Sequence, residues 1–249
     1  MPLFFYHPSS SASLRILLAL RLKKIESIQE VVVKTFLCEK GIPRWELPTE
    51  SSIAKELGTT DWLKFNPEGR VPVYIENNKM MTQTTSIFEY IEETYSTDNN
   101  NNNIFPLLPA DPWLRAESRR IASIVAADIQ PYQNLPFLIQ AVVDFDMKGD
   151  LEQIITHPMR QHFIRREFTA LEEILNITSN TYCVGDELSM ADCYLVPQVR
   201  NALGANINIK SEFPTLYRTF ENCLNVPEIH QTLIECGGIV QPTGRYLKK

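Results

Sequence analysis

The chain begins with two short apolar runs that flank an amphipathic stretch. Residues 3–6, Leu-Phe-Phe-Tyr, are typical of a buried strand, and the β-branched residues within 27–36 favour a second strand. Between the two runs, apolar side chains recur at spacings of three and four, the pattern of an amphipathic helix; they are Leu14, Leu17, Leu18, Leu22 and Ile25. This order predicts a βαβ unit with two parallel strands.

The pattern then predicts a loop, a hairpin and a helix. Residues 38–60 contain glycine and prolines and predict a long loop with a helix near 52–57, which either covers a site or is a surface insertion. Residues 70–76 and 79–82 predict a hairpin. Its Pro72 favours an irregular or edge position and is compatible with a cis bond. Residues 84–95 predict a helix that buries Ile87, Phe88 and Ile91.

A run of five asparagines breaks the pattern within residues 96–112. With neighbouring serine, aspartate and proline, this composition predicts an interdomain linker at 98–110, between domains at 1–97 and 111–249. After it, helical periodicity dominates and no convincing strand follows; the expected helices are 113–131, 163–176, 188–203 and 213–225. The predicted fold is therefore α+β, a thioredoxin-like domain (βαβ-α-ββ-α) followed by an all-α helical domain.

Composition and charge exclude several classes of function. Hydrophobic residues make up 44% of the chain, which is ordinary for a soluble globular protein, and a net charge of −6 gives no electrostatic support for nucleic-acid binding. The five cysteines lack a CxxC pattern and the four histidines lack ligand spacing, so neither a disulfide framework nor a metal site is expected. We see neither a signal peptide nor a membrane span, and we expect a cytoplasmic protein.

A serine cluster stands where the first strand passes into the first helix. Ser9, Ser10, Ser11 and Ser13 precede or open the apolar series. Serine before such a series is most often a helix N-cap, and spacing alone favours that role. A hydroxyl at a helix N-terminus also carries chemistry, because the unpaired N–H groups and the positive end of the dipole favour an anion. Spacing leaves both roles open.

Four stretches resemble the zeta class of the glutathione transferase superfamily, the maleylacetoacetate isomerases. SSSASLRILLALRLKKI (9–25) is similar to SSCxxRVRIALxLKGI, and NPEGRVPV (66–73) with TQTTSIFEYIEE (82–93) is similar to NPxxxVP with QSxAIIEYLEE. DIQPYQNL (128–135) matches IQPxQNL, and YCVGDELSMADCYLVPQVRNA (182–202) is close to YCVGDEVTMADxxLVPQVxNA. The resemblance covers residues 3–235, and its last two motifs are specific to the zeta class.

The resemblance implies a glutathione site with serine chemistry. Ser10 and Ser11 fall on the family's paired serines, so Ser10 is the expected catalytic donor to the glutathione sulfur, and Ser11 its support and helix cap. A thiol titrates near ~8.5, and each ~1.4 kcal/mol of preference for the thiolate lowers that pKa by one unit. The implied glutathione-binding residues are Ser10, Ser11, Ala12, Val71, Pro72, Gln83, Thr84, Gln130 and Asn134. Helix capping is the alternative role of the serines and of Gln83 and Thr84. For Pro72 the alternative is a plain edge-strand proline, and for Gln130 and Asn134 it is internal hydrogen bonding.

Three departures from the family pattern concern the substrate. Ala12 replaces the family's cysteine, and Ser9 and Gly204 replace arginines that members carry. A dianionic substrate needs a cation. Arg200 precedes Gly204 by four residues and therefore shares its helix face, which makes it our candidate, with Arg15 as the second.

The resemblance implies glutathione-dependent isomerisation of maleylacetoacetate to fumarylacetoacetate in phenylalanine and tyrosine catabolism. It also implies transferase activity on small α-halo acids, glutathione as cofactor, a small anionic substrate and a homodimer. The alternatives are a general glutathione transferase without isomerase function and, in a different class, a non-catalytic transferase-fold scaffold. Ser189 and Asp192 match a helix capping box, and we expect them to serve folding rather than catalysis.

Overall fold

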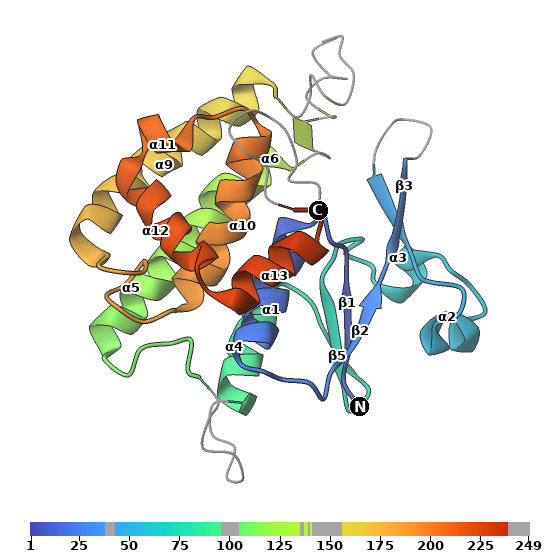
Figure 1. Ribbon diagram of the computed structural model, residues 1–249. Coiled ribbons are helices and arrows are strands. Elements are labelled where there is room, and N and C mark those ends of the chain that lie inside the picture. Colours follow the sequence, from blue (N-terminus) through green and yellow to red (C-terminus); the bar gives the residue numbers. More distant parts are fainter. Residues whose placement is uncertain (38–42, 96–104, 135–136, 139, 141–155, 239–249) are drawn as a thin grey trace. The chain divides into compact units, whose positions relative to one another are not determined.

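The computed structural model describes residues 1–37, 43–95, 105–134, 137–138, 140 and 156–238 (Figure 1). The chain divides into two compact units, Met1–Ile104 and Phe105–Lys249. Part of the expected linker, residues 96–104, lies outside the described residues, and the predicted domain boundaries stay a prediction.

The first unit is built on a four-stranded sheet in the order β2-β1-β5-β6. Its strands are β1 (Leu3–Tyr6), β2 (Gln29–Val32), β5 (Val73–Glu76) and β6 (Lys79–Met81). β1 and β2 are parallel and are joined by α1 (Ser11–Leu22), whereas β5 is antiparallel to both β1 and β6. The predicted βαβ unit and the hairpin are therefore confirmed, and Asn77 and Asn78 take the positive φ of a tight hairpin turn.

The predicted single strand at 27–36 is wrong, because the chain leaves the sheet at Val33. This residue donates its N–H to Tyr6 O and is 1% exposed. The chain continues as β3 (Lys34–Leu37), which pairs with β4 (Pro43–Glu46) in a separate hairpin. The segment expected to be mainly loop at 38–60 thus contains a strand as well as the predicted helix, α2 (Ser52–Leu57); residues 38–42 lie outside the described residues.

Helices cover both faces of the sheet (Figure 1). On one side lie α1 and α4 (Thr84–Tyr95), which pack against each other and bury Ile87, Phe88 and Ile91 as predicted. On the other side lies the short α3 (Trp62–Phe65). Because side chains alternate along a strand, Phe5 and Val73 pack into the core on the α3 side. That core comprises Phe5, Val33, Leu47, Ala54, Trp62, Phe65, Val71 and Val73.

The second unit is helical, as predicted. Its helices are α5 (Pro112–Ser123), η1 (Ile124–Ile129), α6 (Gln130–Gln133), α9 (Pro158–Thr178), α10 (Met190–Gly204), α11 (Ile209–Glu212), α12 (Pro214–Leu224) and α13 (Pro227–Glu235). Within its described part, the only β pairing is an isolated bridge between Ser179 and Gly185. The expected continuous helix over 113–131 is interrupted by η1, a π-helical segment. Pro131 explains this, because proline lacks an N–H and its ring disturbs the preceding helical turn.

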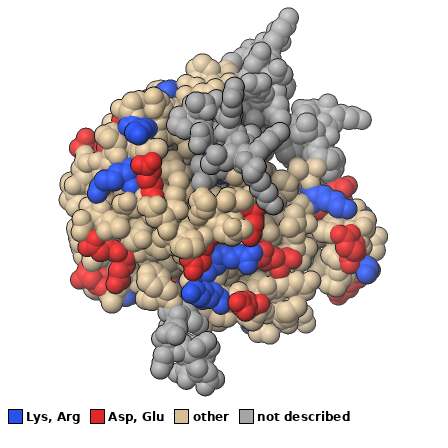
Figure 2. All heavy atoms as spheres, in the orientation of Figure 1, with Lys and Arg blue, Asp and Glu red and all other residues tan. Residues whose placement is uncertain are grey.

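The surface charge and the helix hydropathy bear on the kinds of partner that the protein binds. On the face drawn in Figure 2, acidic and basic side chains are interspersed rather than gathered into one basic patch. None of the helices in the described part of the chain is both long and apolar enough to cross a membrane.

Candidate active site

The N-terminus of α1 is built around Ser10. Its hydroxyl oxygen accepts a hydrogen bond from the Ser13 N–H at 3.2 Å, and its own N–H donates to His7 O at 3.0 Å. Ser10, not Ser11, is therefore the N-cap, which corrects the expected capping role of Ser11. Ser11 already has helical geometry and is 8% exposed, so its side chain lies beyond the position from which a residue caps.

Capping leaves the Ser10 hydroxyl able to donate. Its oxygen is the acceptor from Ser13, so the hydroxyl proton is not used in that bond. The N–H groups of Ser11 and Ala12 have no acceptor among the described residues, as is usual for the first turn of a helix. This end of α1 therefore has a hydroxyl proton and two backbone N–H groups that can donate to an anion.

His7 organises the loop between β1 and α1 and was missed from the sequence. The ring Nδ1 of His7 accepts the Ser9 N–H at 3.2 Å and lies 2.7 Å from Ser9 Oγ. The backbone N–H of His7 donates to Ser13 Oγ at 3.3 Å. Burial lowers the pKa of the imidazole, so the ring is neutral at pH 7. It stacks obliquely on Trp45, with 5.0 Å between ring centroids. A lone histidine beside the serines was the only available signal.

The Val71–Pro72 peptide bond is cis, which the sequence left possible. Both residues are buried, and they directly precede β5. The preceding carbonyl, Arg70 O, accepts hydrogen bonds from Asn66 Nδ2 at 2.8 Å and from Trp62 Nε1 at 3.3 Å. The turn that leads into the cis bond is thus fixed by side chains of α3 and of its C-cap.

Gln83 and Thr84 stand at the N-terminus of α4. The Gln83 carbonyl accepts the N–H of Ile87 at 3.0 Å, so Gln83 takes the first position of the helical hydrogen-bond series. Its φ of +65° lies in the left-handed region, which a non-glycine residue seldom adopts. Its side-chain Nε2 donates to Glu68 Oε2 at 2.6 Å. The N–H groups of the first α4 turn are those that a helix leaves without an intrahelical acceptor.

Strand register brings these three segments of the first unit to the same end of the sheet. β1 and β5 are antiparallel with Phe5 opposite Val73, so the end of β1 lies beside the start of β5. β6 is antiparallel to β5 with Met81 opposite Tyr74, so the end of β6 also lies there. We call this the candidate-site end of the sheet; residues 7–11, 71–72 and 82–84 extend from it.

Gln130 and Asn134 belong to the second unit, where they begin and follow α6. Both are half-buried, and the Asn134 N–H donates to Gln130 O at 3.2 Å. Between them, Gln133 is 3% exposed and forms two amide hydrogen bonds with Gln198 of α10, at 2.6 and 3.0 Å. Sequence reasoning missed this buried pair, which fixes α6 against α10.

The two candidate substrate cations have different surroundings. Arg200 lies on α10 and is half-buried, and its Nη2 donates to Cys236 O at 2.6 Å, where α13 ends. Arg15 lies on α1 one turn after Ser11 and is 1% exposed. Arg200 thus has a structural contact that fixes its guanidinium at the end of α13.

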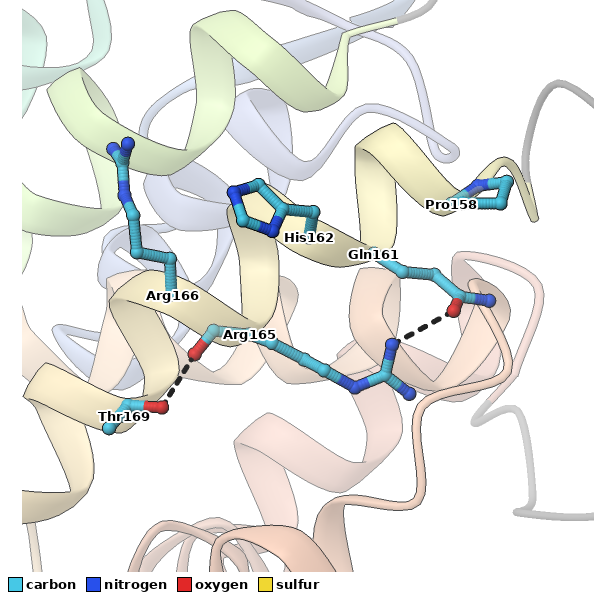
Figure 3. Close-up of a pocket in the computed structure, with 6 residues that line it drawn as sticks. All are labelled: Pro158, Gln161, His162, Arg165, Arg166 and Thr169. Carbon is cyan, nitrogen blue, oxygen red and sulfur yellow. Dashed lines mark hydrogen bonds between the residues drawn. The ribbon is translucent and has the colours of Figure 1, made fainter.

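A recess of about 410 Å³ on α9 contains none of these residues (Figure 3). It is lined by Pro158, Gln161, His162, Arg165, Arg166 and Thr169. Arg165 forms an ion pair with Glu212 at 2.6 Å, and Arg166 forms one with Glu167 at 2.6 Å. Because carboxylates already neutralise both guanidinium groups, we do not assign a reaction to this recess. The part of the chain that the structure describes also lacks a cluster of side chains fit to hold a metal ion.

Comparisons with known proteins agree with the fold. The family described as glutathione S-transferase, N-terminal domain matches residues 4–101, and the family described as glutathione S-transferase, C-terminal domain matches residues 161–227. The mouse (Mus musculus) maleylacetoacetate isomerase is 34% identical over 86% of this chain and 84% of its own length. A zeta-class glutathione S-transferase of Euphorbia esula is 30% identical over 90% and 86%, respectively.

A solved structure extends the likeness to nearly the whole chain. Maleylacetoacetate isomerase from Anaeromyxobacter dehalogenans, with glutathione bound in its active site, has a TM-score of 0.71 at 23% identity. The match covers 98% of this chain and 98% of that protein. At this identity the likeness concerns the fold.

Proposed function

The chain belongs to the glutathione S-transferase family, and on this premise we propose that it isomerises maleylacetoacetate to fumarylacetoacetate with glutathione as cofactor. This reaction is a step in the breakdown of phenylalanine and tyrosine. The observation that carries the proposal is the start of α1, where the Ser10 hydroxyl and the N–H groups of Ser11 and Ala12 lie at the candidate-site end of the sheet.

Activation of the glutathione thiol is assigned to this helix start. The Ser10 hydroxyl donates a hydrogen bond to the sulfur, and Ser11 and Ala12 add backbone donors in line with the helix dipole. These interactions favour the thiolate over the thiol and lower the thiol pKa. The carbonyl and N–H of Val71, just before β5, pair with the cysteinyl part of glutathione as an added strand would.

The remaining glutathione ligands hold the rest of the tripeptide. Gln83 and Thr84 receive the γ-glutamyl carboxylate at the start of α4, where Thr84 supplies a hydroxyl. Gln130 and Asn134 of the second unit are further ligands by resemblance.

The reaction is an addition, a rotation and an elimination. The thiolate lone pair forms a C–S bond with one carbon of the cis double bond, and the π electrons move onto the conjugated carbonyl oxygen as an enolate. The former double bond is now single and rotates. The enolate electrons then re-form the double bond in the trans arrangement and expel the thiolate, so glutathione is regenerated. The same thiolate displaces halide from small α-halo acids.

Isomerisation of maleylacetone, a stable relative of the substrate, tests the proposed function. We expect the purified protein to bind glutathione-agarose and to isomerise maleylacetone only when glutathione is present. Chlorodinitrobenzene conjugation is the comparison reaction, because it needs the thiolate but not the enolate step. Strong aryl conjugation with no turnover of maleylacetone would favour the general transferase. A protein that does not bind glutathione-agarose would favour the non-catalytic scaffold.

Arg200 is our proposed cation for the substrate carboxylates, with Arg15 as the second candidate. Arg200→Ala is expected to raise the KM for maleylacetone about tenfold and to leave the KM for glutathione unchanged, since a charge-assisted hydrogen bond to a carboxylate is lost. Steady-state kinetics with either substrate varied checks this. Arg218→Ala is the matched control, because Arg218 also binds a backbone carbonyl of its unit, Asn180 O at 2.8 Å. An unchanged KM for maleylacetone would remove Arg200 from the site.

Assembly and location follow from the family and from the cysteines. We propose a cytoplasmic homodimer, because the family is dimeric and because the four described cysteines are all buried and form no disulfide. Burial raises the pKa of Cys183 and Cys223, which keeps these thiols protonated and unreactive. Light scattering that gives the mass of a single chain would contradict the dimer.

A further inference from the structure

The loop before the cis bond carries a carboxylate, Glu68, that neither the motifs nor the proposed reaction uses. Its Oε1 accepts a hydrogen bond from Thr82 Oγ1 at 2.5 Å, and its Oε2 accepts one from Gln83 Nε2 at 2.6 Å. Thr82 and Gln83 are the two residues that immediately precede α4. Glu68 is therefore fixed beside the helix start that the glutathione site is proposed to use.

The backbone of this loop is fixed as well. The Glu68 N–H donates to Asn66 Oδ1 at 3.1 Å, and Asn66 is 1% exposed. The next residue, Gly69, has a φ of +64°, and a Cβ there would stand 3.0 Å from Leu63 Cδ2. The turn is thus set by a buried asparagine and by a glycine that other residues replace poorly. The carboxylate of Glu68 has a defined position before any ligand arrives.

Within the described part of the chain, no ion pair neutralises the charge of Glu68. Both of its side-chain donors, a hydroxyl and an amide, are neutral. Among the described residues, no lysine, arginine or histidine forms an ion pair with it. A carboxylate has about four acceptor positions, so two bonds leave room for a further donor. The side chain is exposed, so a ligand can reach it.

We propose that Glu68 binds the α-ammonium group of the γ-glutamyl residue of glutathione. This inference rests on the proposed function, in which the start of α4 and Thr84 receive the α-carboxylate of the same residue. The ammonium and the carboxylate are attached to one carbon atom, so their two receptors must be neighbours. Glu68, held by the residues directly before Thr84, meets that condition. Together, Glu68 and the start of α4 select thiols that carry both a free α-ammonium and a free α-carboxylate group.

A ligand that differs only in the amino group tests this pairing. Glutaryl-cysteinylglycine is glutathione without the α-amino group. We expect Glu68→Gln, which keeps the shape and an acceptor for Thr82, to weaken glutathione binding about tenfold. Binding of the glutaryl thiol should be the same in both proteins. The KM for glutathione should rise with little change in kcat at saturation, since the sulfur contacts are untouched.

Glu93→Gln is the matched control. Glu93 lies exposed in the last turn of α4, so its substitution removes the same charge far from the helix start. We expect it to bind both thiols as the unaltered protein does. If Glu68→Gln weakens both thiols alike, Glu68 only orients Thr82 and Gln83, and the inference is overturned. Equal glutathione affinity in Glu68→Gln and the unaltered protein would overturn it too. If the unaltered protein binds neither thiol, the proposed function itself fails.

Discussion

Replacing Ser10 by alanine is expected to lower kcat/KM for isomerisation about a hundredfold while the protein stays folded. The hydroxyl proton is the one side-chain donor assigned to the sulfur, and removal of a single donor to a developing or full anion costs roughly a hundred- to a thousandfold in other enzymes. The N–H groups of Ser11 and Ala12 remain, so activity should fall without disappearing. Kinetics with maleylacetone measure the loss.

A spectroscopic titration separates thiol activation from folding. The ultraviolet absorbance of bound glutathione thiolate gives its apparent pKa, which in Ser10→Ala should move back toward the ~8.5 of a free thiol. Ser10→Thr keeps a hydroxyl and should recover most of the activity. If bound glutathione titrates in Ser10→Ala at the same pKa as in the unaltered protein, activation belongs to the helix dipole and the backbone donors alone.

Ser51→Ala is the matched control for lost capping. Ser51 caps α2, and its hydroxyl accepts the Ala54 N–H at 3.2 Å, the same distance as the bond from Ser13 to Ser10. Each substitution removes one N-cap and should cost about 1 kcal/mol of stability. Only Ser10→Ala should also lose activity. If the two variants lose activity equally, the loss reflects folding.

The fold was predictable where local pattern decided the structure. The leucine spacing of α1 and the asparagine pair of the hairpin turn are local signals, and the structure confirms both elements. The break at Val33 was not predictable, because continuous β-branched residues suit one strand or two. Whether one strand or two forms depends on β4, which pairs with β3 and lies in the segment that the sequence predicts as loop. α3 has four residues and is too short to show a period.

The candidate site was predictable only in part for the same reason. The motifs locate Ser10, Pro72 and Gln83 along the chain, and strand register explains why their segments meet. The contacts around them depend on distant partners. Glu68 meets Gln83 from 15 residues away, and Gln133 meets Gln198 from 65 residues away. Neither pair has a spacing that a sequence pattern could reveal.

Removal of the Asp192 side chain is expected to have the largest effect on stability. Asp192 is 0% exposed, and its carboxylate accepts the Cys183 N–H at 2.9 Å, the Ser189 N–H at 2.8 Å and the Ser189 hydroxyl at 3.0 Å. It thereby joins the start of α10 to the loop before it, as the capping-box prediction required. Asp192→Ala leaves these buried donors without an acceptor, which should cost about 3–5 kcal/mol. Urea unfolding followed by circular dichroism measures it.

Asp186→Ala is the control for this loop. Asp186 lies in the same segment and accepts hydrogen bonds from Asn180 at 2.8 Å and Thr181 at 2.6 Å, but it is exposed. Its loss should shift the urea midpoint little, because water can replace the carboxylate. Equal shifts in both variants would show that the loop as a whole, and not the buried carboxylate, supports α10. If Asp192→Ala does not fold, Asp192→Asn provides a milder variant.

The pH dependence of Asp192→Asn shows which force dominates at the buried carboxyl. Burial raises the pKa of Asp192, and the hydrogen bonds from Cys183 and Ser189 oppose that rise. Because the folded pKa is the higher one, the folded state holds the proton more tightly than the unfolded state between the two pKa values. The stability due to Asp192 is therefore greatest below the unfolded pKa and declines as pH rises through the folded pKa. Asparagine does not titrate, so the stability deficit of Asp192→Asn should be largest in acid and shrink toward neutral pH. A deficit that instead grows with pH would mean that hydrogen bonding to the ionised carboxylate outweighs its burial.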